Sequence, residues 1–257
     1  MVASSTLVAA VVFAFVIAFI FSMFGQGGGS VYSPLLILLG FSILLSTSTS
    51  LVLNLITSLS AGYIFYRKGM IDFRTSLVFA PGISLGAFAG GALSKAFDTT
   101  VLLWVFVIFL LGVGARMIYS YWEKDKVEEH LPQSRSVTTY LLVAVFGLAV
   151  GFIAGLLGVG GGIFVVPFMV YVYKVPTKIA AGSSHLIISF SALAGILGHA
   201  TSHHFDLLLI VVTGIAVLVG GNLGARVSMK VNTKMIKAGL GLIMFAFAAQ
   251  LLVTLVG

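Results

Sequence analysis

Residues 24–36 read FGQGGGSVYSPLL, and residues 157–169 read LGVGGGIFVVPFM. Each glycine of the first stretch has a counterpart 133 positions later, as Gly25 has in Gly158. A stretch this rich in glycine cannot continue a regular helix at low cost, because glycine destabilises helix interiors. The chain therefore interrupts an apolar run at two equivalent places.

The similarity extends beyond the glycines and indicates a duplicated unit. The same offset relates the pairs Ser50/Ser183, Ser58/Ser191 and Gly62/Gly195. After a one-residue insertion the offset becomes 134, and it then relates Gly86/Gly220 and Gly90/Gly224. We therefore expect two structurally similar halves.

The composition indicates a membrane protein. Of the 257 residues, 60% are hydrophobic and 8% are charged, and the mean hydropathy is +1.18. A soluble domain carries about 25% charged residues, so this chain lacks the polar residues that a water-facing surface needs. The apolar runs are continuous over about twenty residues, which favours membrane-spanning helices over the alternating strands of a barrel. The chain has no cysteine, which excludes disulfide bonds and thiolate metal ligands.

Each half contains five apolar segments. They cover residues 6–24, 31–45, 49–66, 75–94 and 100–121, then 138–157, 163–173, 177–199, 206–227 and 234–256. We expect the first to be a true span, because no basic region precedes it as in a signal peptide. The second of each set is short: at ~1.5 Å per residue, 163–173 covers about half of a ~30 Å hydrocarbon core. These segments either cross with help from their loops, giving ten crossings, or turn back, giving eight.

The distribution of Lys and Arg separates these two topologies. With ten crossings, 13 of the 14 basic residues lie on one side and only Lys95 lies on the other. With eight crossings, they divide 7 to 7. Because membrane proteins concentrate Lys and Arg in cytoplasmic loops, the pattern favours ten. The net charge of +7 therefore reflects topology, and we expect no nucleic-acid partner.

An odd number of crossings per half makes the second copy enter from the opposite side. We therefore predict an all-α polytopic protein with two inverted repeats, residues 1–122 and 138–257. A polar linker, 123–137, would lie in the cytoplasm, and both termini outside. In membrane transporters, paired Gly-interrupted segments in inverted repeats mark a site near the bilayer midplane.

The two glycine loops are candidate anion-binding elements. Successive glycines allow backbone N–H groups to converge on an anion, and each loop precedes a short helix whose N-terminus is positively polarised. The candidate residues are Gly25, Gln26, Gly27, Gly28, Gly29 and Ser30 in the first loop, and Gly158, Gly160, Gly161 and Gly162 in the second. The alternative for these glycines is close helix packing in lipid.

The next segment of each half carries polar side chains. Ser50, Asn54, Thr57 and Ser58 share one helical face, since they fall at i, i+4, i+7 and i+8. The second copy has Ser183, Ser184, His185, Ser189 and Ser191. We select Ser50, Asn54, Ser183 and Ser184 as donors to an anion. Interhelical hydrogen bonding is the alternative for each of them.

The absence of Asp and Glu from the middle of the apolar segments also limits the class of substrate. All seven Asp and Glu lie in loops or at segment ends. Cation and proton carriers often hold a carboxylate within the membrane, so this pattern favours an anionic or neutral substrate. His185 and His199 are weak candidates for a coupling residue.

A histidine-rich stretch raises a different class of function. His199, His203 and His204 have an HxxxHH spacing that could bind iron in a membrane enzyme. Such a centre needs more ligands than these, so we expect no metal site and no cofactor.

The duplicated G-x-GGG-x4-P block, the Ser/Thr-rich span after it and the GxxxGA-type endings resemble the sulfite exporter TauE/SafE family. The resemblance covers almost the whole chain. It implies a permease of the prokaryotic plasma membrane, with small sulfur anions such as sulfite or organosulfonates as substrates. Gln26 stands where the second copy has Val159, so a side-chain donor would occur in one loop only.

The paired loops and the lack of a carboxylate within the segments predict a secondary transporter, and not an enzyme, for a small oxyanion. The resemblance implies that this oxyanion contains sulfur and is exported. The anion would bind near the midplane between the two glycine loops, and the protein's other contact would be the lipid bilayer. An anion channel with the same site and a metal enzyme remain the alternatives. Both a monomer and a homodimer are compatible with the sequence.

Overall fold

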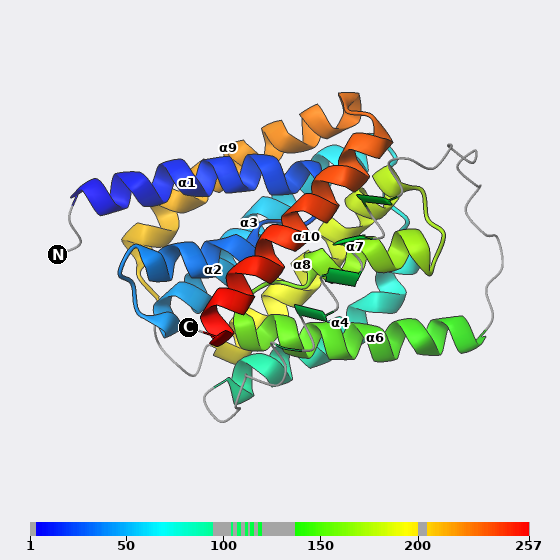
Figure 1. Ribbon diagram of the computed structural model, residues 1–257, viewed down its shortest axis with the longest axis horizontal. Helices are drawn as coiled ribbons and strands as arrows, with labels where there is room; N and C mark the ends of the chain where they lie inside the picture. The colour runs from blue at the N-terminus through cyan, green and yellow to red at the C-terminus, as the bar shows by residue number, and fades with distance from the viewer. Residues whose placement is uncertain are drawn as a thin grey trace.

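The computed structural model describes residues 4–94, 137–199 and 205–256, together with some of the residues between 104 and 119. In this part of the chain all regular secondary structure is helical (Figure 1). The helices are α1 Ser4–Met23, α2 Gly29–Leu38, α3 Ile43–Arg67, α4 Phe73–Leu93, α6 Val137–Leu157, α7 Gly162–Tyr171, α8 Thr177–His199, α9 Leu207–Lys230 and α10 Thr233–Val256. The predicted all-α polytopic architecture is confirmed. Most of the expected segment 100–121, and the linker up to residue 136, lie outside the described residues.

Length, hydropathy and polar caps define the helices. Among the described residues, six helices are long and apolar enough to cross a bilayer: α1, α3, α4, α6, α8 and α9. Asp72 caps α4 by accepting the N–H of Thr75 at 3.0 Å, and Asp206 caps α9 by accepting that of Leu209 at 3.0 Å. Such a cap contributes about 1 kcal/mol to helix stability.

The short helices α2 and α7 begin in the middle of the bundle and run to opposite ends (Figure 1). At one end of the bundle, Met23 at the end of α1 accepts a hydrogen bond from Ser228 near the end of α9. Toward the opposite end, Leu36 in the last turn of α2 packs against Ala10 and Leu209. With ten residues each, α2 and α7 cover about 15 Å, half of the hydrocarbon core. The glycine loop before each short helix supplies the rest of the path.

Helices of one half pack directly against helices of the other half. α4 packs along α6, α9 packs along α1, and both pairs run parallel. A Cβ atom at Gly86 would overlap the carbonyl oxygen of Leu148, and one at Gly224 would overlap that of Phe19. These glycines therefore allow the backbones of the paired helices to approach closely, as small residues do between membrane helices.

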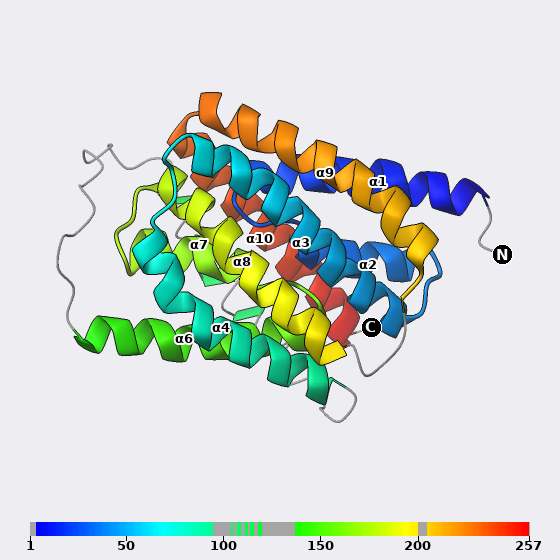
Figure 2. The same ribbon diagram turned by 180° about the vertical axis from the view of Figure 1, so that it is seen from behind.

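Between these outer pairs, α3 and α8 cross the centre of the bundle (Figure 2). α3 packs on α9 and α8 packs on α4, so the contacts repeat between the halves. Because α1 and α6 run in opposite directions, as Figure 1 shows, the repeats are inverted.

The described Lys and Arg residues gather at one end of the bundle. They lie at the end of α3 (Arg67, Lys68), the start of α4 (Arg74), the α7–α8 connection (Lys174, Lys178), the end of α9 (Arg226, Lys230) and the start of α10 (Lys234, Lys237). Lys178 donates to the carbonyl oxygen of Met229 at 3.0 Å, which joins two of these segments. This arrangement agrees with the ten-segment topology.

Candidate functional site

The two glycine loops meet at the centre of the bundle. A Cβ atom at Gly29 would lie 2.6 Å from the carbonyl oxygen of Val159, and one at Gly162 would lie 2.7 Å from that of Gln26. The two contacts are equivalent under the repeat. The N-termini of α2 and α7 therefore face each other across a backbone contact, and their positive dipole ends converge on one region.

Both loops use backbone conformations that favour glycine. The φ angles are 76° at Gly25, 74° at Gly27, 105° at Gly28, 71° at Gly158, 74° at Gly160 and 76° at Gly161. Residues that carry a Cβ atom rarely adopt this left-handed backbone conformation. The paired glycines therefore have two functions: they close the turn before each short helix and leave room for the opposing loop.

Asn54 of α3 contacts both loops. Its Oδ1 accepts the N–H of Gly29 at 3.2 Å, while a Cβ atom at Gly160 would overlap its Nδ2. The residue is fully buried, and its Nδ2 has no hydrogen-bond partner among the described residues. An unpaired amide in such a place is costly, so Nδ2 is a donor available to a ligand at the junction of the two repeats.

Ser50 connects the loops one turn away from Asn54. Its Oγ lies 2.9 Å from the carbonyl oxygen of Gly29 and 3.0 Å from that of Gly158. One hydroxyl proton serves these two acceptors in turn, so Ser50 holds the backbones of both loops. Both contacts are with backbone carbonyls of the loops, and the role of Ser50 as a donor to the anion stays a prediction.

The second repeat places Ser184, not Ser183, in the equivalent position. Ser184 donates to the carbonyl oxygen of Gly25, which mirrors the contact of Ser50 with Gly158. Ser183 instead accepts the N–H of Asp72 at 2.7 Å, at the start of α4. The pairing of Ser50 with Ser183 expected from the sequence is therefore wrong by one residue.

The two sides of the junction differ in polarity. Ile188 occupies the position equivalent to Asn54, since a Cβ atom at Gly162 would lie 2.5 Å from its Cδ1. Within the loops, Val159 corresponds to Gln26 and Ile163 corresponds to Ser30. The polar side chains of the site thus come mainly from the first repeat.

Several of these polar groups are buried without a protein partner among the described residues. They are both side-chain atoms of the Gln26 amide, the hydroxyls of Ser30 and Ser58, and Asn54 Nδ2. Each residue is at most 2% exposed. Together they offer neutral N–H and O–H donors beside two positively polarised helix ends, a combination suited to an anion.

His185 and His199 do not join this cluster. His185 Nε2 lies 3.2 Å from the carbonyl oxygen of Ser22, and His199 Nε2 lies 3.0 Å from that of Gly155. His203 and His204 lie outside the described residues. Within the residues described, no group of three potential metal ligands occurs.

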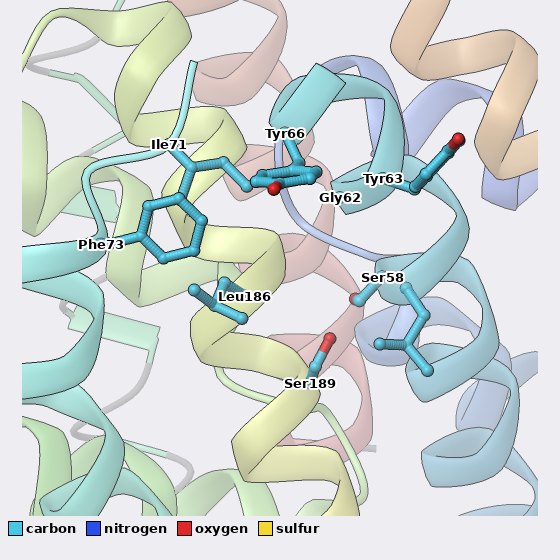
Figure 3. A pocket seen from close by; sticks show the side chains of 9 residues that line it. Ser58, Gly62, Tyr63, Tyr66, Ile71, Phe73, Leu186 and Ser189 are labelled. Carbon is cyan, nitrogen blue, oxygen red and sulfur yellow. The ribbon is translucent and has the colours of Figure 1, made fainter. Parts of the chain in front are cut away.

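A pocket of about 460 Å³ lies between α3 and α8 (Figure 3). Ser58 and Ser189 face it from the two helices, and Tyr63, Tyr66 and Phe73 lie nearer the basic end. A Cβ atom at Gly27 would lie 2.8 Å from Ser58 Oγ, so Ser58 separates the pocket from the first loop. Sequence reasoning missed these aromatic residues, although Ser58, Gly62 and Tyr66 follow one another at a four-residue spacing, which is a usable signal for Tyr66.

Comparison with known proteins agrees with these features. The family model for the sulfite exporter TauE/SafE matches residues 10–251. The chain is similar to the probable membrane transporter protein YunE of Bacillus subtilis, with 28% identity over 250 residues, 90% of this chain and 92% of that protein. It is also similar to the probable membrane transporter protein YdhB of the same organism, with 29% identity over 82% of this chain and 86% of that protein.

A more distant relative is the probable membrane transporter protein MJ0441 of Methanocaldococcus jannaschii, with 22% identity over 87% of each chain. No solved structure matches the chain. The family match spans both repeats, including both glycine loops and the helices that contact them. The chain therefore belongs to the sulfite exporter TauE/SafE family of membrane transporters.

Proposed function

We propose that this transporter exports a small sulfur-containing oxyanion, such as sulfite or an organosulfonate, across the plasma membrane of a prokaryote. The anion binds at the junction of the two glycine loops, near the bilayer midplane. The observation that carries the proposal is the position of Asn54. Its unpaired Nδ2 lies against Gly160 while its Oδ1 holds the N–H of Gly29.

The surrounding donors support an anionic substrate. Gln26, Ser30 and Ser58 add neutral donors, and the N-termini of α2 and α7 add partial positive charge. The described acids, Asp72 and Asp206, cap α4 and α9 at the ends of the bundle, away from this region. The substrate would therefore meet no described carboxylate at the centre.

The inverted repeat supports a carrier mechanism. Because the loops approach the centre from opposite faces, rocking of one half against the other exposes the same site to either side. In this mechanism the end that carries Lys and Arg faces the cytoplasm, and both termini lie outside. An anion channel would use the same residues, but its flux would follow the anion gradient without coupling to another ion.

The substitution Asn54→Asp tests the site, because it keeps the size and the oxygen that accepts the Gly29 N–H but replaces the donor Nδ2. We expect uptake of sulfite or sulfoacetate into inverted vesicles to fall by about 10- to 100-fold at pH 8, the range implied by losing one charge-assisted hydrogen bond. Protein level and melting temperature provide the control. Wild-type transport rates in the Asp variant would contradict the proposal.

A further inference from the structure

A second pocket, of about 560 Å³, lies between the C-terminal ends of α3 and α9. Its lining residues are Tyr63, Ile64, Arg67, Lys68, Arg226, Met229 and Lys230. Four of the seven carry a positive charge, and none carries a negative charge. The C-terminal ends of both helices are negatively polarised, which explains how these cations are held close together.

The positive charge of this pocket is not neutralised within the described part of the chain. The described acids are Asp72 and Asp206, and each accepts hydrogen bonds at the start of its own helix. None of the four cations forms an ion pair with either of them. A concave surface with one sign of charge concentrates ions of the opposite sign.

Tyr63 joins this basic pocket to the pocket between α3 and α8, because it lines both. In Figure 3 the pocket between α3 and α8 extends from Tyr63 to Ser58 along α3. Ser58 in turn borders Gly27, and Asn54 lies one helical turn further. From the C-terminal end of α3 inward, the two connected pockets thus present cations, then aromatic rings, and then the Ser58 hydroxyl, one turn before Asn54.

We infer that the basic pocket is a peripheral anion site that collects the transported anion at the Lys/Arg-rich end and delivers it along α3 toward Ser58. This inference rests on the proposed function, since it assumes an anionic substrate at the centre. The basic pocket requires a ligand that carries a sulfonate, sulfite or phosphate group. A phospholipid headgroup carries the same chemistry, so the experiment must separate the two sources.

The first test needs no transport activity. The chain has no cysteine, so Tyr63→Cys introduces a single thiol at the junction of the two pockets. In purified full-length protein, a negatively charged methanethiosulfonate reagent should react several-fold faster than a positively charged one. Adding Arg67→Gln and Arg226→Gln should remove this preference, and sulfoacetate should slow the reaction only when both arginines are present.

Lys174→Asn is the matched control for lost charge. Lys174 lies at the same end of the bundle but does not line the pocket, and Asn tolerates its φ of 55°. This variant should keep the reagent preference of the Tyr63→Cys protein. Equal rates for both reagents with Arg67 and Arg226 present would overturn the inference.

The second test measures transport in vesicles of pure phosphatidylcholine, which supply no anionic headgroup. Removing Arg67 and Arg226 together should raise the KM for sulfoacetate by about three- to tenfold at low salt, leave the maximal rate unchanged and weaken the salt dependence. An effect that appears only when phosphatidylglycerol is added would assign the pocket to lipid and overturn the inference. If the proposed function fails instead, the wild type transports no anion, while the cysteine reaction still reports the pocket.

Discussion

The two repeats build nearly the same backbone at the centre but surround it with different side chains. Both loops have three glycines in the left-handed region, and both precede a ten-residue helix. On one side, however, Asn54 bridges the loops, while the equivalent position on the other side holds Ile188. The two repeats thus share the backbone scaffold, whereas the polar side chains at the junction come mainly from the first repeat.

This comparison has a mechanistic consequence. A symmetrical scaffold can open to either face with equivalent packing, but an asymmetrical set of donors holds the substrate against one repeat. The first repeat would then supply the side-chain donors to the anion, and the second would supply the backbone of its glycine loop, the N-terminus of α7 and apolar side chains. The substitutions below test this division, in order of decreasing effect.

The largest effect is expected for Gly160→Ala. The added methyl group would overlap Asn54 Nδ2, and the left-handed φ of 74° adds strain. We expect transport to be lost, measured as sulfite efflux from cells with equal protein levels. Gly69→Ala provides the control, since its φ is also positive at 66° but nothing lies within 4 Å. In that variant only backbone strain lowers the free energy of unfolding, by about 1–3 kcal/mol, so the protein should still transport.

A smaller effect is expected for the two serines that fasten the loops. Ser50→Ala and Ser184→Ala each remove the donor to a buried loop carbonyl, at Gly158 and Gly25 respectively. We expect each variant to lose about 1–3 kcal/mol of stability and several-fold in transport rate. Ser183→Ala should reduce thermal stability by a similar amount but leave the KM unchanged, because Ser183 contacts Asp72. Equal transport defects at positions 183 and 184 would contradict the structural pairing.

The smallest effect is expected for Ile188→Val, the mirror position of Asn54. Removing one buried methylene costs about 0.5–1.5 kcal/mol. Because Ile188 offers no donor to the anion, the transport rate should stay within twofold of the wild type at matched protein level. A large rise in KM would show that the second repeat contacts the substrate more closely than we propose.

Much of the fold could be predicted from the sequence, because the glycine pairs, the apolar runs and the sorting of Lys and Arg each depend on short-range or compositional patterns. Their combination predicted the inverted repeat. The register of α8 could not be predicted. α2 and α3 are joined by residues 39–42, whereas α7 and α8 are joined by residues 172–176, so the extra residue lies in this connection. Because Ser183 and Ser184 are adjacent, an offset of 133 also pairs Ser50 with a serine, although the structural equivalent is Ser184.

The contact of Asn54 with both glycine loops could not be predicted from the sequence either. Its position on a polar face was visible, but its contact with Gly160 depends on how two distant segments meet in space. The same applies to the pockets along α3, where residues from α8 and α9 complete surfaces that begin on one helix. Such convergence depends on tertiary packing and leaves no periodic signal in the chain.

The central claim is that the junction of the two glycine loops holds the anion, and crystals of the wild-type protein soaked with selenite test it most directly. Selenite has the shape and charge of sulfite, and its selenium can be located by anomalous scattering. The account predicts a selenium peak within hydrogen-bonding distance of Asn54 Nδ2, between the loops that contain Gly27 and Gly160. Selenium bound elsewhere at saturating concentration, with no peak at this junction, would contradict it.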